Sequence, residues 1–194
     1  MLFYRVCHWA VRTFLALLWQ IETIGLENVP ASGGGVICSN HSSNWDPIVL
    51  TTRVSRQLHF MAKAELFENP LLRWFLLRIG MVRVQRGRSD RNAIRDVLAY
   101  LAAGDLCGIF PEGRRYQDGE LHAFLQGAAY FAIKSGVPLI PTAISGDYRK
   151  FRSRIRVRFG EALHPPAQSD LDRATMEQWT NALMQAIRAL QEAE

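Results

Sequence analysis

His41 and Asp46 lie five positions apart in the sequence NHSSNWDP, residues 40–47. If the chain turns back here, the carboxylate can hold one ring nitrogen of the imidazole and leave the other free to accept a proton. Such a pair can act as a general base when an alcohol attacks an acyl carbonyl. The same spacing also occurs where a loop histidine lies beside a carboxylate that caps the following helix. The spacing alone leaves both interpretations open.

A covalent acyl-enzyme would need a nucleophile, and the sequence offers no evident one. The chain contains no G-x-S-x-G motif. Cys7, Cys38 and Cys107 are widely spaced, which indicates reduced, buried thiols in a cytosolic protein rather than a disulfide framework or a metal site. Ser42 and Ser43 are better interpreted as residues at the start of a helix. We therefore expect direct transfer of the acyl group to the alcohol.

A second group of polar residues follows an apolar strand candidate, in the sequence FPEGRR at residues 110–115. Arg114 and Arg115 suit the binding of a phosphate through charge-assisted hydrogen bonds, and Glu112 can hold an arginine or a substrate hydroxyl. Arg86 occupies an equivalent position at the end of MVRVQR. A solvated turn is the alternative interpretation of FPEGRR. Several cationic strand ends around one histidine predict an anion site.

The elements that must position these residues alternate along the chain. Apolar, β-branched runs predict strands, and segments with helical periodicity predict helices between them. Strands are expected within residues 21–30, 36–40, 57–62, 81–87, 106–113, 137–144 and 154–160. Helices are expected within residues 1–20, 41–52, 70–79, 89–104, with Ser89 as N-cap, 125–136 and 172–190. This alternation predicts an α/β fold with a mixed, mostly parallel sheet covered by helices, in which sites gather at the carboxyl ends of strands.

Length and charge restrict the class of protein further. A chain of 194 residues with 48% hydrophobic content fits one domain with a sizeable core. The net charge of +5 suits nucleic acid, anionic lipid or phosphorylated substrates without choosing among them. Residues 149–158 are rich in arginine, and their last strand is expected near a sheet edge. A non-catalytic module that binds anionic membrane or nucleic acid through this segment is an alternative function, although no recognised nucleic-acid motif is present.

Residues 1–20 form the expected N-terminal amphipathic helix, and residues 21–194 form the remaining domain. The uninterrupted apolar run from Thr13 to Trp19 is shorter than the about 20 residues needed to span a bilayer. The pattern predicts a helix that docks in the plane of a membrane surface, and the alternative is an ordinary amphipathic helix packed on its own domain. The residues expected near one face are Leu2, Phe3, Val6, Trp9, Ala10, Phe14, Leu17 and Leu18.

Four sequence blocks, in order along the chain, resemble those of the 1-acyl-glycerol-3-phosphate acyltransferases, also called lysophosphatidate acyltransferases. The blocks are NHSSNWDP, GMVRVQRG, FPEGRR and VPLIPTAI. The resemblance extends from about Ile24 to Gly160, which is most of the chain. It implies a glycerolphosphate-acyltransferase-like fold, with residues 21–194 as the acyltransferase domain.

The resemblance also implies a role for each matching residue. His41 would be the base that activates the glycerol hydroxyl, with Asp46 as its partner. The residues that would bind substrate are Arg86, Glu112, Gly113, Arg114 and Arg115, which would hold its phosphate, and Lys63, which would line the pocket.

The activity implied by the resemblance is transfer of a fatty acyl group from acyl-CoA or acyl carrier protein to the free hydroxyl of 1-acyl-glycerol-3-phosphate. No cofactor and no metal would be needed. The partners would be a phospholipid membrane, the lysophospholipid and the acyl donor, without nucleic acid. The enzyme would lie on the cytoplasmic face of the cell membrane as a peripheral or monotopic protein.

The third block departs from the usual family sequence. It usually continues Thr-Arg-Ser, where this chain has Arg114, Arg115 and Tyr116, and Gln126 stands where a lysine is common. Another lysophospholipid or an acylated amine lipid is therefore the alternative acceptor.

Overall fold

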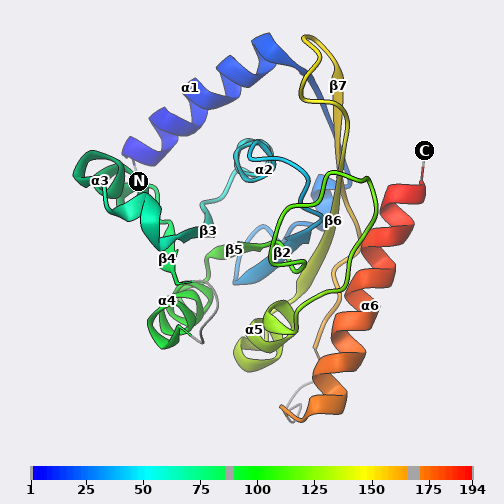
Figure 1. Ribbon diagram of the computed structural model, residues 1–194. Helices are drawn as coiled ribbons and strands as arrows, with labels where there is room; N and C mark the ends of the chain where they lie inside the picture. Colours follow the sequence, from blue (N-terminus) through cyan, green and yellow to red (C-terminus); the bar gives the residue numbers. More distant parts are fainter. Residues whose placement is uncertain (1, 86–89, 166–170, 194) are drawn as a thin grey trace.

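The computed structural model describes residues 2–85, 90–165 and 171–193. Within them, the strands form one seven-stranded sheet in the order β1-β7-β6-β2-β5-β3-β4 (Figure 1). Neighbouring strands run parallel except β6 and β7, which run antiparallel. The predicted α/β class with a mostly parallel sheet is confirmed. The strands are β1 (Gln20–Ile24), β2 (Gly35–Ser39), β3 (Leu58–Lys63), β4 (Val82–Val84), β5 (Leu106–Ile109), β6 (Leu139–Ser145) and β7 (Arg154–Phe159).

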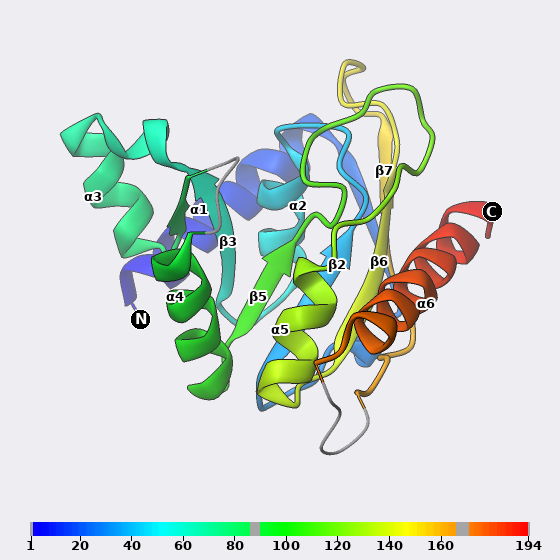
Figure 2. The same cartoon turned by 60° about the horizontal axis from the view of Figure 1, so that its bottom comes forward.

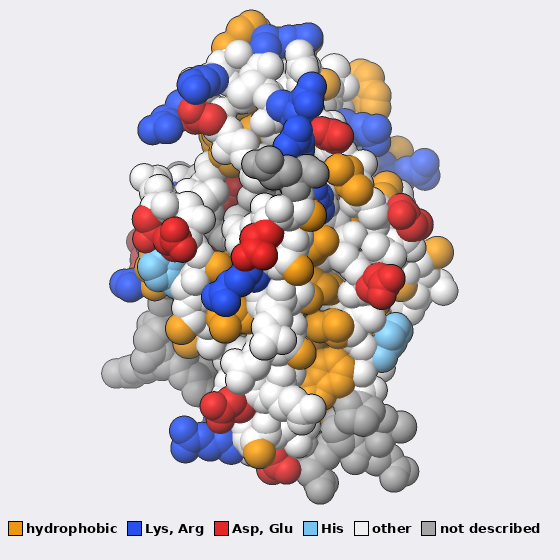
Figure 3. Space-filling model, turned by 90° about the vertical axis from the view of Figure 1, so that its right-hand side faces the viewer, with side chains coloured by type: hydrophobic (Ala, Val, Ile, Leu, Met, Phe, Trp, Pro, Cys, Tyr) orange, Lys and Arg blue, Asp and Glu red, His pale blue; other side chains and the backbone are white. Residues whose placement is uncertain are grey.

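Helices cover both faces of the sheet. α1 and α2 lie on one face, while α4, α5 and α6 lie on the other (Figures 1 and 2). The face along α6 carries a band of hydrophobic side chains among charged ones of both signs (Figure 3). The helices are α1 (Leu2–Leu18), α2 (Asp46–Arg53), α3 (Pro70–Arg78), α4 (Arg91–Ala102), α5 (Gly127–Ser135) and α6 (Arg173–Glu192), with short 3-10 helices at Leu26–Asn28 and Ala64–Phe67.

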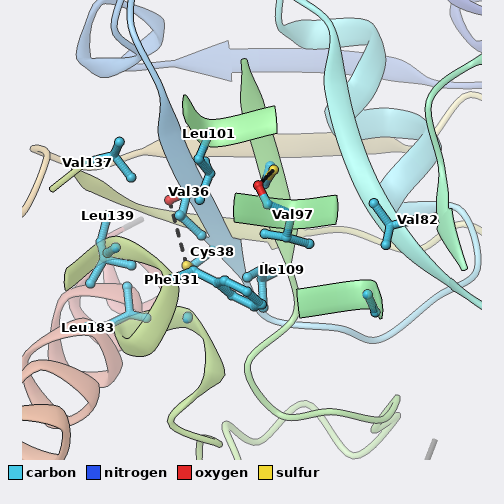
Figure 4. Close-up of a cluster of buried hydrophobic side chains, with 14 of the residues drawn as sticks. Val36, Cys38, Val82, Val97, Leu101, Ile109, Phe131, Val137, Leu139 and Leu183 are labelled. Carbon is cyan, nitrogen blue, oxygen red and sulfur yellow. Dashed lines mark hydrogen bonds between the residues drawn. The ribbon is translucent and has the colours of Figure 1, made fainter. Parts of the chain in front are cut away.

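Two hydrophobic clusters fix these layers because successive side chains of a strand point to opposite faces. In β2, Val36 and Cys38 pack toward α4, α5 and α6, whereas Ile37 packs toward α1 and α2. Figure 4 shows the first cluster, in which Val36 and Cys38 meet Leu139 and side chains from the three helices. β2 is buried along its whole length, so the strand that leads to His41 runs through the centre of the core.

The buried thiols belong to this core and not to a reactive site. Cys38 and Cys107 are buried and Cys7 is half-buried, and all three are free. Burial raises the pKa of Cys38, and it raises the pKa of Cys107 to about 12. Because a thiol nucleophile acts as the thiolate, neither buried cysteine is suited to form an acyl-enzyme.

One detail differs from the sequence-based expectations. The N-cap of α4 is Asp90, whose side chain accepts hydrogen bonds from the N–H groups of Asn92 and Ala93. The expected cap, Ser89, lies outside the described residues, and the helix therefore begins one position later. The expected position of the last strand near a sheet edge is confirmed, because β7 lies next to β1, which forms the edge.

α1 packs through a different face from the apolar one expected to dock on a membrane. Tyr4 and Leu15 are buried, and the Tyr4 hydroxyl accepts a hydrogen bond from the N–H of Leu58. Most side chains of the predicted docking face are exposed, whereas two of them, Phe3 and Leu18, are half-buried. The exposed large apolar ones are Leu2, Val6, Trp9, Phe14 and Leu17. No described helix is long and apolar enough to cross a membrane.

Candidate functional site

His41 and Asp46 are in contact at the carboxyl end of β2. The Nδ1 atom of His41 lies 3.0 Å from Oδ2 of Asp46, a fully buried residue at the start of α2. The same oxygen accepts hydrogen bonds from the N–H groups of Ser42, at 2.8 Å, and Ser43, at 2.7 Å. The carboxylate accepts a hydrogen bond from Nδ1–H of the neutral imidazole, and this tautomer has its lone pair on Nε2, where it can act as a base.

The capping interpretation of Asp46 is wrong. The N-cap of α2 is Trp45, and no side chain caps this helix end. Asp46 instead binds the N–H groups that precede it, so it organises the loop around His41. Ser43 does lie at the helix entry, where its hydroxyl accepts a hydrogen bond from the N–H of Trp45.

Asn40 fixes the point at which the chain leaves β2. Its buried side-chain amide donates to the carbonyl of Ile144 at 2.9 Å and accepts from the N–H of Ile144 at 2.8 Å. This pair of hydrogen bonds attaches the loop to β6. No local sequence pattern predicts this role of Asn40, because its partner Ile144 is distant in sequence.

The loop after β5 holds His41 from a second side. The ring of Phe110 stacks on the imidazole at 3.9 Å between centroids, and the ring of Phe60 stacks on Phe110. The side chain of Glu112 accepts a hydrogen bond from the N–H of His41 at 3.3 Å, and the carbonyl of His41 accepts one from the N–H of Tyr116 at 2.9 Å. The histidine is thus fixed through both its ring and its backbone.

Glu112 and Gly113 shape this loop. Glu112 is buried, and burial raises the pKa of its carboxyl, while the hydrogen bond from the His41 N–H opposes the rise. Gly113 has φ 73°, and a Cβ there would lie 2.7 Å from Cδ1 of Leu125. The observed contact of Glu112 is therefore with His41, and substrate binding by either residue stays a prediction.

Glu112 leads to a prediction about stability. Because folding raises the pKa of Glu112, its ionisation lowers the free energy of unfolding as the pH rises. Glu112→Gln stays neutral and can still accept from the His41 N–H. We expect this variant to unfold at a higher temperature than the wild type at about pH 8, with the difference lost near pH 4. Glu120→Gln, an exposed position in the same loop, is the control, and an equal change there would contradict the prediction.

The predicted cationic residues lie at the same edge of the sheet as His41. Lys63 is the exposed last residue of β3, and the exposed Arg114 and Arg115 follow β5, which lies between β2 and β3. Nε of Arg114 donates to the Tyr116 hydroxyl at 2.6 Å, and its guanidinium lies over the Tyr116 ring. Arg86 lies outside the described residues.

A cavity of about 570 Å³ adjoins the site, lined by both sequence neighbours of His41. Other parts of its wall are formed by Arg188 and its neighbours at the end of α6 and by four residues of the loop after β5, namely Gln117, Gly119, Glu120 and Leu121. Among the described residues, no group of three His, Cys, Asp or Glu side chains is arranged to hold a metal ion. The site therefore combines a carboxylate-bound histidine, flanking cations and a polar hollow.

The comparisons with known proteins agree on one enzyme family. The family model described as Acyltransferase matches residues 20–145. A 1-acyl-sn-glycerol-3-phosphate acyltransferase of Bacillus subtilis is 31% identical over 194 residues, covering 97% of this chain and 96% of that protein. A protein of the same name from Pseudomonas aeruginosa is 29% identical over 208 residues, covering 97% and 77%.

The fold is shared with a solved structure. The crystal structure of the 1-acyl-sn-glycerophosphate (LPA) acyltransferase PlsC from Thermotoga maritima superimposes with a TM-score of 0.76 at 23% identity, covering 98% of this chain and 82% of that chain. This likeness confirms the glycerolphosphate-acyltransferase-like fold. Since the sequence matches extend over most of the chain, the protein is an O-acyltransferase that belongs to the 1-acyl-sn-glycerol-3-phosphate acyltransferase family.

Proposed function

We propose that this enzyme transfers a fatty acyl group from an acyl thioester, acyl-CoA or acyl carrier protein, to the free hydroxyl of 1-acyl-sn-glycerol-3-phosphate. The observation that carries the proposal is the 3.0 Å contact between Nδ1 of His41 and the buried carboxylate of Asp46. That contact leaves Nε2 as the proton acceptor of the site. The names of the relatives supply the acceptor.

The proposed reaction is a direct displacement at the thioester carbonyl. Nε2 of His41 takes the hydroxyl proton as the oxygen forms its bond to the carbonyl carbon. The carbon–sulfur bond then breaks, and the departing thiolate receives the proton from the imidazolium. Asp46 stabilises the imidazolium between these steps. The reaction balances without a metal or other cofactor, and neither takes part in our proposal.

The phosphate of the acceptor would lie at the cationic edge of the sheet. Lys63, Arg114 and Arg115 are exposed at the carboxyl ends of neighbouring strands. β2, β5 and β3 are consecutive in the sheet, so one acceptor molecule could place its glycerol hydroxyl at His41 and its phosphate at these three side chains. Arg86 and Glu112, with Gly113 in the same turn, complete the proposed phosphate site.

We propose that the enzyme works on the cytoplasmic surface of the bilayer, where its lipid substrate is found. α3 adds the exposed side chains of Leu71, Trp74 and Leu77 to the exposed apolar side chains of α1. The two helices are in contact, because Phe3 of α1 packs against Trp74 of α3. Near the other end of α1, the N–H of Arg152 donates to the carbonyl of Leu18. An apolar surface with adjoining cations suits anionic lipid.

The charge distribution supports the same orientation. On the face in Figure 3, Lys and Arg side chains gather at the end of the molecule where the β6–β7 connection lies. Arg149, Lys150 and Arg154 of this region are exposed, as is the apolar ring of Phe151. The arginine-rich segment 149–158 therefore joins the proposed lipid surface.

Three substitutions on α1 test membrane docking. Replacing Trp9, Phe14 and Leu17 together by Ser should weaken partitioning onto anionic phospholipid vesicles about 100-fold, because each side chain is exposed and its apolar area would enter the bilayer surface. Deletion of α1 is a poorer test, since Leu15 belongs to the core. Vesicle sedimentation measures the effect.

The control for docking is Leu171→Ser, which removes an exposed apolar side chain at the opposite end of the molecule, near the start of α6. It should leave partitioning unchanged. Wild-type partitioning by the triple variant would reject α1 as the docking element.

An acceptor-by-donor activity matrix tests the proposed substrates. Purified enzyme would be assayed with 1-acyl-glycerol-3-phosphate, a lysophospholipid without a phosphomonoester and an acylated amine lipid, each with acyl-CoA and with acyl carrier protein. We expect the highest kcat/KM with the phosphomonoester acceptor. A strong preference for either other acceptor would replace this proposal by the alternative substrate.

A further inference from the structure

The second oxygen of Asp46 has no assigned partner. Oδ2 accepts from His41, Ser42 and Ser43, whereas Oδ1 is buried and makes no hydrogen bond to a described residue. A buried carboxylate oxygen without a donor is unfavourable, since it has lost its hydration. A buried hydrogen-bond donor beside Oδ1 of Asp46 would remove this cost.

Tyr148, in the connection between β6 and β7, supplies such a donor. Its hydroxyl is also buried and without a hydrogen-bond partner among the described residues. Its ring packs edge-on against Trp19 at 5.2 Å, and Trp19 packs against Trp45, the residue before Asp46, at 5.1 Å. Trp19 thus packs against both the phenol ring and the residue that precedes α2.

The electrostatic environment of the phenol supports this placement. Burial raises the pKa of Tyr148, and the negative charge of Asp46 raises it further. A phenol with a raised pKa stays protonated and remains a donor at neutral pH. The two buried polar atoms are therefore one donor and one acceptor from neighbouring residues.

We propose that Tyr148 is a positioning residue that donates its hydroxyl hydrogen to Oδ1 of Asp46 and so extends the His41–Asp46 pair to a chain of three side chains. This inference rests on the proposed role of His41 as the base. The hydrogen bond keeps the carboxylate ionised and fixes its orientation, so that Oδ2 remains directed at Nδ1 when His41 becomes charged.

Removal of the phenol oxygen should alter both rate and pH dependence. Tyr148→Phe keeps the ring against Trp19 and removes only the donor. We expect kcat to fall about 10- to 100-fold with KM nearly unchanged, the effect of one buried hydrogen bond to a charged group. Without the donor, protonation of the His41–Asp46 pair becomes easier, so the acid limb of the kcat/KM profile should move to higher pH.

Other titratable groups near the pair must be considered in that pH profile. Glu112 contacts the backbone of His41, and His122 lies close enough to influence Glu112. Asp147, beside Tyr148, pairs with Arg149 and Lys150 at the surface. Tyr148→Phe removes no contact of these groups, so a shift of the acid limb reports on the His41–Asp46 pair.

The control is Tyr130→Phe, which removes a phenol oxygen from a half-buried ring on α5 that packs in the other hydrophobic cluster. It should leave kcat and the pH profile unchanged.

A double-mutant cycle supplies a second test. In an Asp46→Asn background, Tyr148→Phe should cause less than about a twofold further loss, because its acceptor is already changed.

Two results would overturn the role of Tyr148, namely wild-type kcat and pH profile in Tyr148→Phe, or losses that multiply fully in the double variant. These results differ from failure of the proposed base, which would appear as an active His41→Ala variant. Loss of activity in His41→Ala together with a silent Tyr148→Phe rejects only the inference about Tyr148.

Discussion

Replacing His41 by Ala is expected to lower kcat about 10⁴-fold, because no other described side chain shares its contact with Asp46 at the end of β2. The fold should survive. The contacts of His41 with Glu112 and Tyr116 use its backbone N–H and carbonyl, which alanine retains. Removal of the ring leaves Phe110 still stacked near Phe60.

The measurement for His41→Ala is single-turnover and steady-state transfer to 1-acyl-glycerol-3-phosphate, with thermal unfolding to establish that the variant is folded. His164→Ala is the matched control, since His164 is exposed beside α6 and follows Leu163, which pairs with Leu139 at the amino end of β6, the opposite edge of the sheet from His41. A folded His41→Ala variant that keeps more than about a tenth of the wild-type kcat would reject His41 as the base.

The alternation of strands and helices was predictable from sequence because each buried strand is a short β-branched or apolar run between turn residues. VICSN, LCGI and VPLIPTAI all became strands of the sheet centre. The order of these strands was not predictable, because it depends on which helices cover which face. β2 lies between β5 and β6, which follow it at very different distances along the chain.

The same distinction applies to the site. The contact of His41 with Asp46 is local, so spacing alone suggested it, and the loop needs only Ser42 and Ser43 to close around the carboxylate. The stacking of Phe110 on His41 and the proposed hydrogen bond from Tyr148 to Asp46 depend on strand order, because β5 and β6 must flank β2 before the loops that follow them can reach the site. Phe110 lies in a recognised sequence block, whereas no motif in this chain marks Tyr148.

Asp46→Asn is expected to lower kcat about 10³-fold with little change in KM. The amide has the size of the carboxylate, and its oxygen can still accept from the N–H groups of Ser42 and Ser43, so the loop should keep its conformation. What it lacks is the negative charge. Without that charge, the imidazolium that forms on His41 during proton transfer is no longer stabilised within a buried site.

The matched control is Asp105→Asn, which changes a carboxylate that lies 3.5 Å from Nε2 of His59 near the amino end of β5, the opposite edge of the sheet. It should retain full activity. The pH dependence separates charge from simple misfolding in Asp46→Asn. Because an amide does not ionise, raising the pH should not restore its rate, and its thermal unfolding should stay close to that of the wild type. A folded Asp46→Asn enzyme with wild-type kcat would show that the buried carboxylate orders the loop without assisting proton transfer.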